Sequence, residues 1–259
     1  MKKNKEKIIL FLAIIIFLIT FLLYDFLIKQ SSRVVFCDVG QGDGTFININ
    51  NDKQILIDGG PDNKFIGCVG KYMPYFDHKI EYVIVSHPDK DHFVGIIEVL
   101  KRYDVEYVIV NGDKSDIPEY EEFLFLAKDK IIKPEDNDFL KFLQKGGDSK
   151  DSNNNSLVFK FIYNNKSILF TGDAPTEVEE KFLDKDLKSD ILKLGHHGSK
   201  TSSSKSFLEA VAPELTIISV GADNKYGHPS YLIIKRLENL GIKYLRTDDL
   251  GDIEIKLEN

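Results

Sequence analysis

The sequence is poor in cysteine, proline and net positive charge and has no excess of glycine, and each of these features excludes a class of protein. Two cysteines among 259 residues, Cys37 and Cys68, are too few for a disulfide framework, and they leave open both a single bridge and two free thiols. The 18 glycines and 8 prolines exclude a collagen-like or low-complexity chain. A formal net charge of −7 excludes a generally basic surface of the kind that binds nucleic acids.

The charge is unevenly distributed along the chain. Residues 1–33 hold six basic and two acidic side chains, a net charge of +4, whereas the rest holds 28 basic and 39 acidic side chains, a net charge of −11. Within the basic segment, positions 8–23 are apolar except for Thr20, and the run extends to Ile28. This is about the 20 residues that a membrane-spanning helix needs, and its apolar residues lie on every side of the helix.

The apolar run is compatible with a cleaved signal peptide or with an uncleaved anchor. The segment that follows it, Lys29-Gln30-Ser31-Ser32-Arg33, has no small-x-small cleavage site. We therefore expect a cytoplasmic stub and anchor over residues 1–30 and a body over residues 33–259, with secretion after cleavage as the alternative. Four lysines precede the run, so the positive-inside rule places the N-terminus in the cytoplasm and the body outside, on a single-pass cell-membrane anchor.

The body begins with short strands and turns and continues with strand–helix units, which predicts one α/β domain with mixed sheets. The polar stretch 146–155 predicts a loop. The expected strands span 34–38, 44–50, 54–58, 81–86, 105–111, 156–163, 167–171, 190–194, 215–220, 242–246 and 252–256. The expected helices span 93–103, 119–128, 177–183, 207–212 and 231–240.

The densest group of metal-binding residue types follows the strand predicted at 81–86 and precedes a helix. His87, Asp89, Asp91 and His92 fall within six residues, and a strand-to-helix turn lets them converge on one point. Imidazole and carboxylate together suit Zn, Mn or Fe. A solvated turn with helix-capping aspartates is the alternative, but it accounts poorly for two histidines at this spacing.

The motif His87-x-Asp89-x-Asp91-His92 resembles the metal motif of the metallo-β-lactamase superfamily, usually written His-x-His-x-Asp-His. Further segments follow in the superfamily's order. They are Leu56-Ile57-Asp58-Gly59-Gly60, Phe170-Thr171-Gly172-Asp173 and Lys193-Leu194-Gly195-His196-His197-Gly198-Ser199. The resemblance covers about residues 33–259 and implies a metallo-β-lactamase-like αββα four-layer sandwich, preceded here by one transmembrane helix.

Within the superfamily the sequence is most similar to the extracellular domain of the ComEC family of competence proteins. The segments that carry this similarity are Asp38-Val39-Gly40-Gln41-Gly42-Asp43, Asn154-Asn155-Ser156-Leu157, His196-His197-Gly198-Ser199 and Gly227-His228-Pro229. The similarity implies a metal-dependent hydrolase of phosphodiesters, specifically an extracytoplasmic DNA nuclease that degrades the strand left outside during DNA uptake.

Two positions depart from the general superfamily pattern. Asp89 stands where a histidine is usual, and Asn155-Ser156 occupies the stretch of the usual third histidine. Both changes make the site richer in oxygen, which shifts its preference toward harder ions. We therefore expect two divalent metal ions, with Mn preferred over Zn.

The resemblance implies a role for each motif residue. His87 and Asp89 would hold one ion, Asp91 and His92 the other, and Asp173 would bridge them. One of His196 and His197 would complete the second site, and the other would act as an acid beside the scissile group; the sequence leaves this choice open. With these two histidines, Asp91 is a catalytic candidate. The ions would lower the pKa of a bridging water and yield a hydroxide nucleophile.

Other residues are expected to support the ligands or bind substrate. Asp58 would orient a ligand, and Ser199 with Lys200 would bind phosphate at a helix start, unless this is an ordinary serine-rich loop. The remaining candidates, each with simple turn or loop chemistry as its alternative, are Asp38, Gln41, Asp43, Asn155, Ser156 and His228.

Three functions remain in competition. DNA is the substrate that the ComEC similarity favours, although an acidic body opposes broad affinity for a polyanion. A hydrolase of small or cell-surface phosphodiesters would use the same motifs. A non-catalytic membrane-tethered binding module would have lost ligands that this sequence retains. The sequence implies contact with the membrane through its N-terminal helix and indicates no obligate protein partner.

Overall fold

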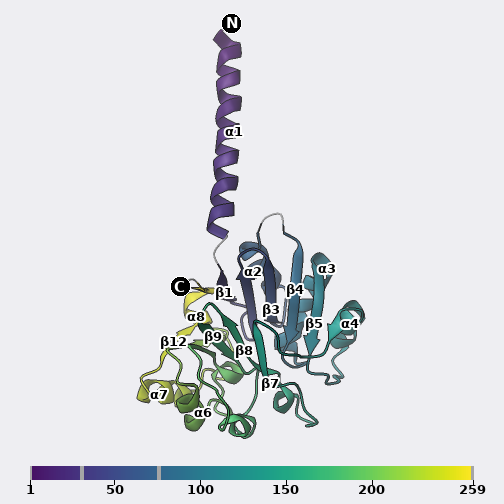
Figure 1. Ribbon diagram of the computed structural model, residues 1–259, viewed down its shortest axis with the longest axis vertical. Helices are drawn as coiled ribbons and strands as arrows, with labels where there is room; N and C mark the ends of the chain where they lie inside the picture. The colour runs from purple at the N-terminus through teal and green to yellow at the C-terminus, as the bar shows by residue number, and fades with distance from the viewer. Residues whose placement is uncertain (1, 30–31, 75–76, 258–259) are drawn as a thin grey trace.

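A single long helix precedes a body of two stacked sheets in the computed structural model, which describes residues 2–29, 32–74 and 77–257 (Figure 1). The helix α1 spans Lys2–Lys29, and its segment Asn4–Tyr24 is long and apolar enough to cross a membrane. None of that segment is buried against the body. Positions 30 and 31, which bear on the cleavage question, lie outside the described residues.

Each sheet combines antiparallel and parallel strands, as predicted. The first sheet has the order β13-β1-β2-β3-β4-β5-β6, antiparallel from β13 to β3 and parallel from β3 to β6. Its strands are β1 (Arg33–Phe36), β2 (Gly44–Ile49), β3 (Lys53–Gly59), β4 (Lys79–Val85), β5 (Asp104–Val110), β6 (Ile131–Ile132) and β13 (Ile253–Lys256).

The second sheet has the order β12-β11-β10-β9-β8-β7, antiparallel from β7 to β9 and parallel from β9 to β12. Its strands are β7 (Leu140–Gln144), β8 (Val158–Tyr163), β9 (Lys166–Phe170), β10 (Ile191–Lys193), β11 (Leu215–Ile218) and β12 (Lys243–Arg246).

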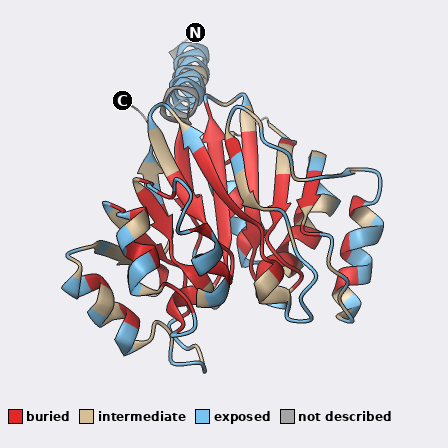
Figure 2. Ribbon diagram, turned by 60° about the horizontal axis from the view of Figure 1, so that its bottom comes forward, coloured by how far each residue is buried: buried red, intermediate tan, exposed pale blue. Residues whose placement is uncertain are grey.

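Helices cover the outer face of each sheet and complete the predicted four layers. The helices α2 (Lys64–Tyr72), α3 (Lys90–Arg102) and α4 (Pro118–Ala127) pack on the first sheet; α5 (Thr176–Glu179), α6 (Lys205–Val211) and α7 (Tyr231–Asn239) pack on the second. Strand residues alternate between layers: Val34 and Phe36 lie between the sheets, whereas Val35 faces the helices. Both sheets are therefore buried on two faces (Figure 2).

The structure adds elements that the sequence pattern did not predict, namely α2, β6, β7 and the short helix α8 (Thr247–Leu250). The helix expected at 177–183 divides into α5 and a 3-10 turn, Glu180–Phe182. The loop expected at 146–155 ends in another 3-10 turn, Ser152–Asn155. Cys37 directly follows β1 and forms a disulfide with Cys68 of α2, so the alternative of two free thiols was wrong.

Candidate metal centre

The predicted metal-binding residues gather at one end of the sandwich, beyond the carboxyl ends of β3, β4, β9 and β10. The order of elements explains this convergence, because neighbouring parallel strands end at the same edge of a sheet. The chain leaves α1 at the opposite edge, where Arg33 begins β1 (Figure 1). The centre therefore lies at the end of the body remote from the attachment of the helix.

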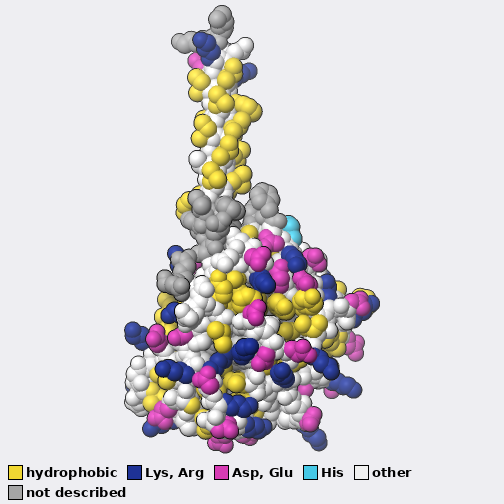
Figure 3. All heavy atoms as spheres, in the orientation of Figure 1, with side chains coloured by type: hydrophobic (Ala, Val, Ile, Leu, Met, Phe, Trp, Pro, Cys, Tyr) yellow, Lys and Arg dark blue, Asp and Glu magenta, His cyan; other side chains and the backbone are white. Residues whose placement is uncertain are grey.

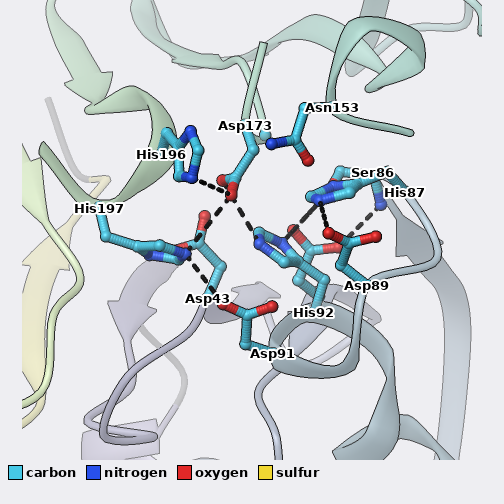
Figure 4. A network of polar contacts seen from close by, with 12 residues as sticks. Asp43, Ser86, His87, Asp89, Asp91, His92, Asn153, Asp173, His196 and His197 are labelled. Carbon is cyan, nitrogen blue, oxygen red and sulfur yellow. Dashed lines mark hydrogen bonds and ion pairs between the residues drawn. The ribbon is translucent and has the colours of Figure 1, made fainter. Parts of the chain in front are cut away.

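Three buried imidazoles direct a ring nitrogen into this centre. His87, His92 and His197 are each at most 1% exposed. Within the described part of the chain, their Nε2 atoms have no hydrogen-bond partner, and neither does Oδ1 of Asp173. Buried polar atoms are normally hydrogen-bonded, so four such atoms without a hydrogen bond at one point fit a cation, which binds the lone pairs of the carboxylate and of the neutral rings. Figure 4 shows the rings arranged around the Asp173 carboxylate.

Asp173 lies at the middle of this arrangement. Its carboxylate oxygens lie 3.3 Å from His92 Nε2, 3.6 Å from His197 Nε2 and 3.6 Å from His196 Nε2. The outer carboxylates complete the set: Asp91 lies 3.3 Å from His197 Nε2, and Asp89 lies 3.7 Å from His87 Nε2. These nitrogen and oxygen donors fit divalent transition metals, with the histidine–aspartate mixture that such ions accept.

A carboxylate and a hydroxyl behind the first two histidines set the direction of both rings. Asp58 accepts hydrogen bonds from the backbone N–H of Ser86 (2.7 Å), from the Ser86 hydroxyl (2.9 Å) and from His92 Nδ1 (2.9 Å). The oxygen of the same hydroxyl lies 3.0 Å from His87 Nδ1 and can accept a hydrogen bond from the Nδ1–H. Both Nδ1 atoms are thus occupied, and the lone pairs of the neutral rings lie on Nε2.

A second buried carboxylate supports His197 from the other sheet. Oδ1 of Asp43 lies 3.1 Å from His197 Nδ1, which also lies 3.1 Å from the carbonyl oxygen of Ser219. The Lys193 ammonium donates to the Asp43 carboxylate at 2.7 Å. Burial opposes ionisation of Asp43, but Lys193 and His197 together hold the pKa of this carboxyl well below its ordinary value.

The loop that carries Asp43 is held against the β4–α3 motif. The Asp43 N–H donates to the Asp91 carbonyl oxygen at 3.0 Å. Gly42 precedes it at φ +144°, and a Cβ there would lie 2.4 Å from the same oxygen. A glycine is therefore required for the two loops to approach this closely.

Electrostatics favour a positive charge in the centre. Burial alone would lower the pKa of His197, yet Asp173 and Asp43 raise it to about 10. Burial likewise opposes protonation of His92, but Asp173 and Asp58 raise its pKa well above the ordinary value. The surrounding carboxylates therefore attract cations, and metal binding must displace protons from these rings.

His196 and His197 are adjacent in sequence but occupy different environments. Both adopt left-handed backbone angles, with φ of 50° and 53°, a conformation that costs roughly 1–3 kcal/mol per residue and is found at functional sites. Their rings are 6.1 Å apart at an interplanar angle of 80°. The His197 side chain is 2% exposed, whereas that of His196 is 27% exposed and its Nδ1 lies 3.2 Å from the Thr201 hydroxyl.

The remaining predicted residues surround the centre at different distances. Asn155 and Ser156 are buried behind it, and the Ser156 hydroxyl accepts from the Asp173 N–H at 3.2 Å. The exposed Asp38 and the partly buried Gln41 line a separate cavity of about 290 Å³. His228 lies 5.9 Å from the His196 ring, centroid to centroid.

The predicted phosphate site is only partly assembled. Ser199 is buried and contacts the Thr201 hydroxyl at 2.9 Å, and Lys200 is exposed. At the start of α6, however, the N–H groups of Ser203 and Ser204 already donate to the buried carboxylate of Glu179. The helix start is thus occupied by an internal acid, and of the two predicted phosphate-binding residues Lys200 is the exposed one.

Sequence reasoning missed the supporting roles of Ser86 and Lys193. A lysine inside a run of buried strand residues, Ile191-Leu192-Lys193-Leu194, was the available signal for Lys193, because a buried lysine needs an acidic partner. Ser86 had no such signal, since a serine before a histidine motif is unremarkable in sequence.

The comparisons with known proteins agree with this geometry. The profile of the Metallo-beta-lactamase superfamily matches residues 37–222. The chain is 28% identical over 273 residues to ComE operon protein 3 of Bacillus subtilis (strain 168), covering 93% of this chain and 35% of that protein. It is 31% identical over 233 residues to competence protein ComA of Neisseria gonorrhoeae, covering 88% of this chain and 33% of that protein.

The chain therefore spans about a third of the length of these curated relatives. Among solved structures, the metallo-beta-lactamase fold protein YhfI of Bacillus subtilis matches with a TM-score of 0.58 at 11% identity, covering 88% of this chain and 100% of that one. This structural match supports the fold, and the family profile covers most of the body, including the motifs from Asp58 to His197. The chain belongs to the metallo-β-lactamase superfamily.

Proposed function

We propose that this protein is a membrane-anchored, extracytoplasmic phosphodiesterase that uses two divalent metal ions and acts on DNA. The observation that carries the proposal is the group of unpaired Nε2 atoms of His87, His92 and His197 around the Asp173 carboxylate. The similarity to competence-related relatives supports DNA as the substrate. The N-terminal helix supports attachment to the membrane.

The donor atoms divide into two groups. We assign His87 and Asp89 to one ion, Asp91, His92 and His197 to the other, and Asp173 to both, since its carboxylate groups with His87 on one side and with His197 on the other. Bound divalent ions supply Lewis-acid chemistry that activates water and offsets negative charge on a phosphoryl oxygen. The oxygen-rich donor set favours Mn over Zn.

The remaining work falls to the chain's own residues. Asp58 and Asp43 keep the rings of His92 and His197 in the orientation that binds a cation. His196 lies beside Asp173 but reaches solvent, so it is placed to give a proton to the leaving oxygen. This division makes His197 the ligand and His196 the acid of the adjacent pair.

A row of aromatic rings favours a nucleic acid over a small phosphodiester. The Tyr226 ring stacks on His228 at a centroid distance of 5.8 Å and an interplanar angle of 19°, and His228 in turn contacts His196 at 5.9 Å. Tyr226 is 72% exposed. An exposed ring that leads toward a hydrolytic centre can stack on a nucleobase whatever its identity.

The acidic body favours the competing candidate, a small or cell-surface phosphodiester. On the face drawn in Figure 3, lysines and acidic residues are interspersed over the body and apolar side chains cover α1. A net charge of −11 over residues 34–259 limits non-specific attraction to DNA. The bound ions would offset part of this charge at the centre itself.

One set of assays separates the two substrates. Full-length protein in detergent is incubated with single-stranded DNA, double-stranded DNA, RNA or bis(p-nitrophenyl) phosphate, each with Mn²⁺, Mg²⁺ or Zn²⁺. We expect Mn²⁺-dependent cleavage of DNA, lost in Asp89→Ala. Removing the exposed ring in Tyr226→Ala should lower kcat/KM on DNA by roughly 5- to 100-fold, which corresponds to the stacking free energy of one base. The kcat/KM on the small ester should stay unchanged.

The control for Tyr226 is Tyr231→Ala, which removes a similarly exposed tyrosine, 71% accessible, from the start of α7. If the protein cleaves only the small ester, DNA is not its substrate and the competing candidate, a small or cell-surface phosphodiester, is favoured. Failure to cleave any phosphodiester with any of the three ions would reject the proposed function.

A further inference from the structure

The ion assigned to His87 and Asp89 has fewer protein donors than its neighbour. In the superfamily pattern described above, a third histidine precedes the Thr-Gly-Asp motif, and Asn155-Ser156 occupies that stretch here. Both side chains already make hydrogen bonds within the fold. The Asn155 amide bonds to Asp113 and to the Ser149 backbone through both its nitrogen and its oxygen, and the Ser156 hydroxyl accepts from Asp173 N–H.

The 3-10 turn Ser152–Asn155 nevertheless reaches the centre through its first two residues. The Ser152 hydroxyl donates to Asp89 Oδ1 at 2.7 Å and so fixes one ligand of this ion. Asn153 follows it, and Figure 4 shows the Asn153 side chain beside Asp173 and the His87 ring. The turn therefore lies directly against the donors of the ion in question.

Asn153 has a buried amide oxygen without a partner: over the described ranges of the chain, its Oδ1 accepts no hydrogen bond. By contrast, the Asn155 Oδ1 accepts from the Ser149 N–H at 3.0 Å, and the Asn154 amide is turned to Glu177, to which its nitrogen donates at 2.5 Å. An amide oxygen carries two lone pairs and is costly to bury unpaired.

We propose that Asn153 binds the His87–Asp89 ion through Oδ1 and supplies the donor that the missing histidine would otherwise provide. An amide oxygen is a hard, neutral ligand of the kind that Mn²⁺ and Mg²⁺ accept readily. An amide oxygen in place of an imidazole nitrogen reduces the number of nitrogen donors at the His87–Asp89 ion and leaves the other ion unchanged. The inference rests on the proposed metal centre, and it makes the preference for Mn a property of this one ion.

The test measures metal binding without any substrate. Full-length protein in detergent is stripped with a chelator, titrated calorimetrically with MnCl₂ and, separately, with ZnCl₂, and analysed for bound metal after gel filtration. We expect wild type to bind two Mn²⁺. In Asn153→Ala, one equivalent should weaken by about 10-fold or more while the other stays unchanged, as for loss of one ligand.

Two further variants make the result specific. Asn154→Ala removes the same side chain from the same turn and should bind both Mn²⁺ ions as wild type does. Asn153→His restores an imidazole and should raise the affinity of the weakened site for Zn²⁺ relative to Mn²⁺. Thermal unfolding of each stripped variant identifies any change that comes from misfolding rather than from a lost ligand.

The outcomes distinguish this inference from the proposed function. Two unchanged Mn²⁺ affinities in a folded Asn153→Ala variant would overturn the inference, even if the enzyme cleaves DNA. A wild type that binds two Mn²⁺ ions, one through Asn153, but cleaves no phosphodiester would overturn the proposed function alone. A wild type that binds neither Mn²⁺ nor Zn²⁺ would overturn both.

Discussion

The two halves of the metal centre orient a buried histidine by different means. In the half built on β3 and β4, His92 donates to Asp58, whose other partner is the neutral Ser86. In the half built on β10, His197 faces Asp43, whose carboxylate is paired with the ammonium of Lys193. Both arrangements leave Nε2 directed at Asp173, the residue between them.

The difference shows that a buried histidine ring can be oriented either by a carboxylate with a neutral second partner or by a carboxylate in an ion pair. The Asp58 carboxylate is bonded to the neutral Ser86 besides its histidine, whereas the Asp43 carboxylate is paired with the Lys193 ammonium. The first arrangement adds to the cation-attracting field, and the second gives a rigid ion pair at the cost of burying a lysine. We therefore expect the two halves to respond differently when their carboxylates are neutralised.

The largest effect is expected where the two halves meet. Asp173→Ala removes the carboxylate that faces His197 and also lies within 4.8 Å of a ring nitrogen of His87. Phosphodiester cleavage should fall by roughly 10³-fold or more, because both ions lose a ligand and the transition-state charge loses its stabilisation. Activity and bound-metal analysis measure this loss. Asp129→Ala, an exposed acid beyond α4, is the control; equal activity of the two variants would contradict a bridging role.

The adjacent histidines allow a sharper separation of metal binding from proton transfer. His197→Ala should weaken metal binding by about 10- to 100-fold or more, since it removes a buried donor. His196→Ala should retain both ions and lose roughly 10²-fold in kcat on DNA, as for a missing general acid. Its loss should be smaller on bis(p-nitrophenyl) phosphate, whose leaving group needs no proton. The opposite pattern would exchange the two roles.

Neutralising each supporting carboxylate compares the halves directly. Asp43→Asn and Asp58→Asn should each lower metal affinity by about 10- to 100-fold. Only Asp43→Asn leaves a buried lysine unpaired, so it should also lower the free energy of unfolding by about 3–5 kcal/mol, against about 1–2 kcal/mol for Asp58→Asn. Chemical denaturation of the metal-free proteins measures this difference.

A double substitution tests the cause of that difference. Adding Lys193→Met to Asp43→Asn removes the unpaired ammonium and should recover most of the lost stability. Metal affinity should stay low, because the carboxylate that orients His197 is still missing. Equal instability of the single and double variants would show that the ion pair is not the origin of the asymmetry.

The smallest effect on activity is expected from the disulfide, which lies outside both halves. Replacing Cys37 and Cys68 by serine opens a loop with a sequence separation of 31 residues, which should cost about 3–4 kcal/mol of stability and roughly 10 °C in Tm. Activity of the folded variant should stay within about two-fold of wild type at 25 °C. A large loss of activity without a loss of Tm would mean that the bridge positions the 38–43 loop.

The sequence predicted the first half of the centre better than the second. His87, Asp89, Asp91 and His92 are contiguous, so a strand–turn–helix pattern alone brings them together. Asp58 was identified as a supporting residue from its place in the first of the superfamily's motifs. In the second half, Asp43 and Lys193 are 150 residues apart, and no local pattern indicates that they form an ion pair.

The secondary structure likewise divides into elements that the sequence predicted and elements that it did not. Strands with two buried faces and helices with one apolar face were found from periodicity, because burial imposes that periodicity directly. The unpredicted α2, β6 and β7 are short or carry mixed patterns, and their place in the fold depends on contacts with distant strands. The pairing of Cys37 with Cys68 likewise depends on α2 packing against the end of β1.

The sequence by itself indicated the apolar N-terminal helix and an α/β body with mixed sheets, because both depend on composition or local spacing, and its resemblance to the metallo-β-lactamase superfamily implied the layered fold and the candidate ligand motifs. The tertiary structure decided which of His196 and His197 lies inward, since two successive left-handed residues turn their rings in different directions. It also decided that Asn153, rather than Asn155, has a free oxygen at the centre. These choices depend on which atoms distant segments leave unpaired, and only the folded chain specifies that.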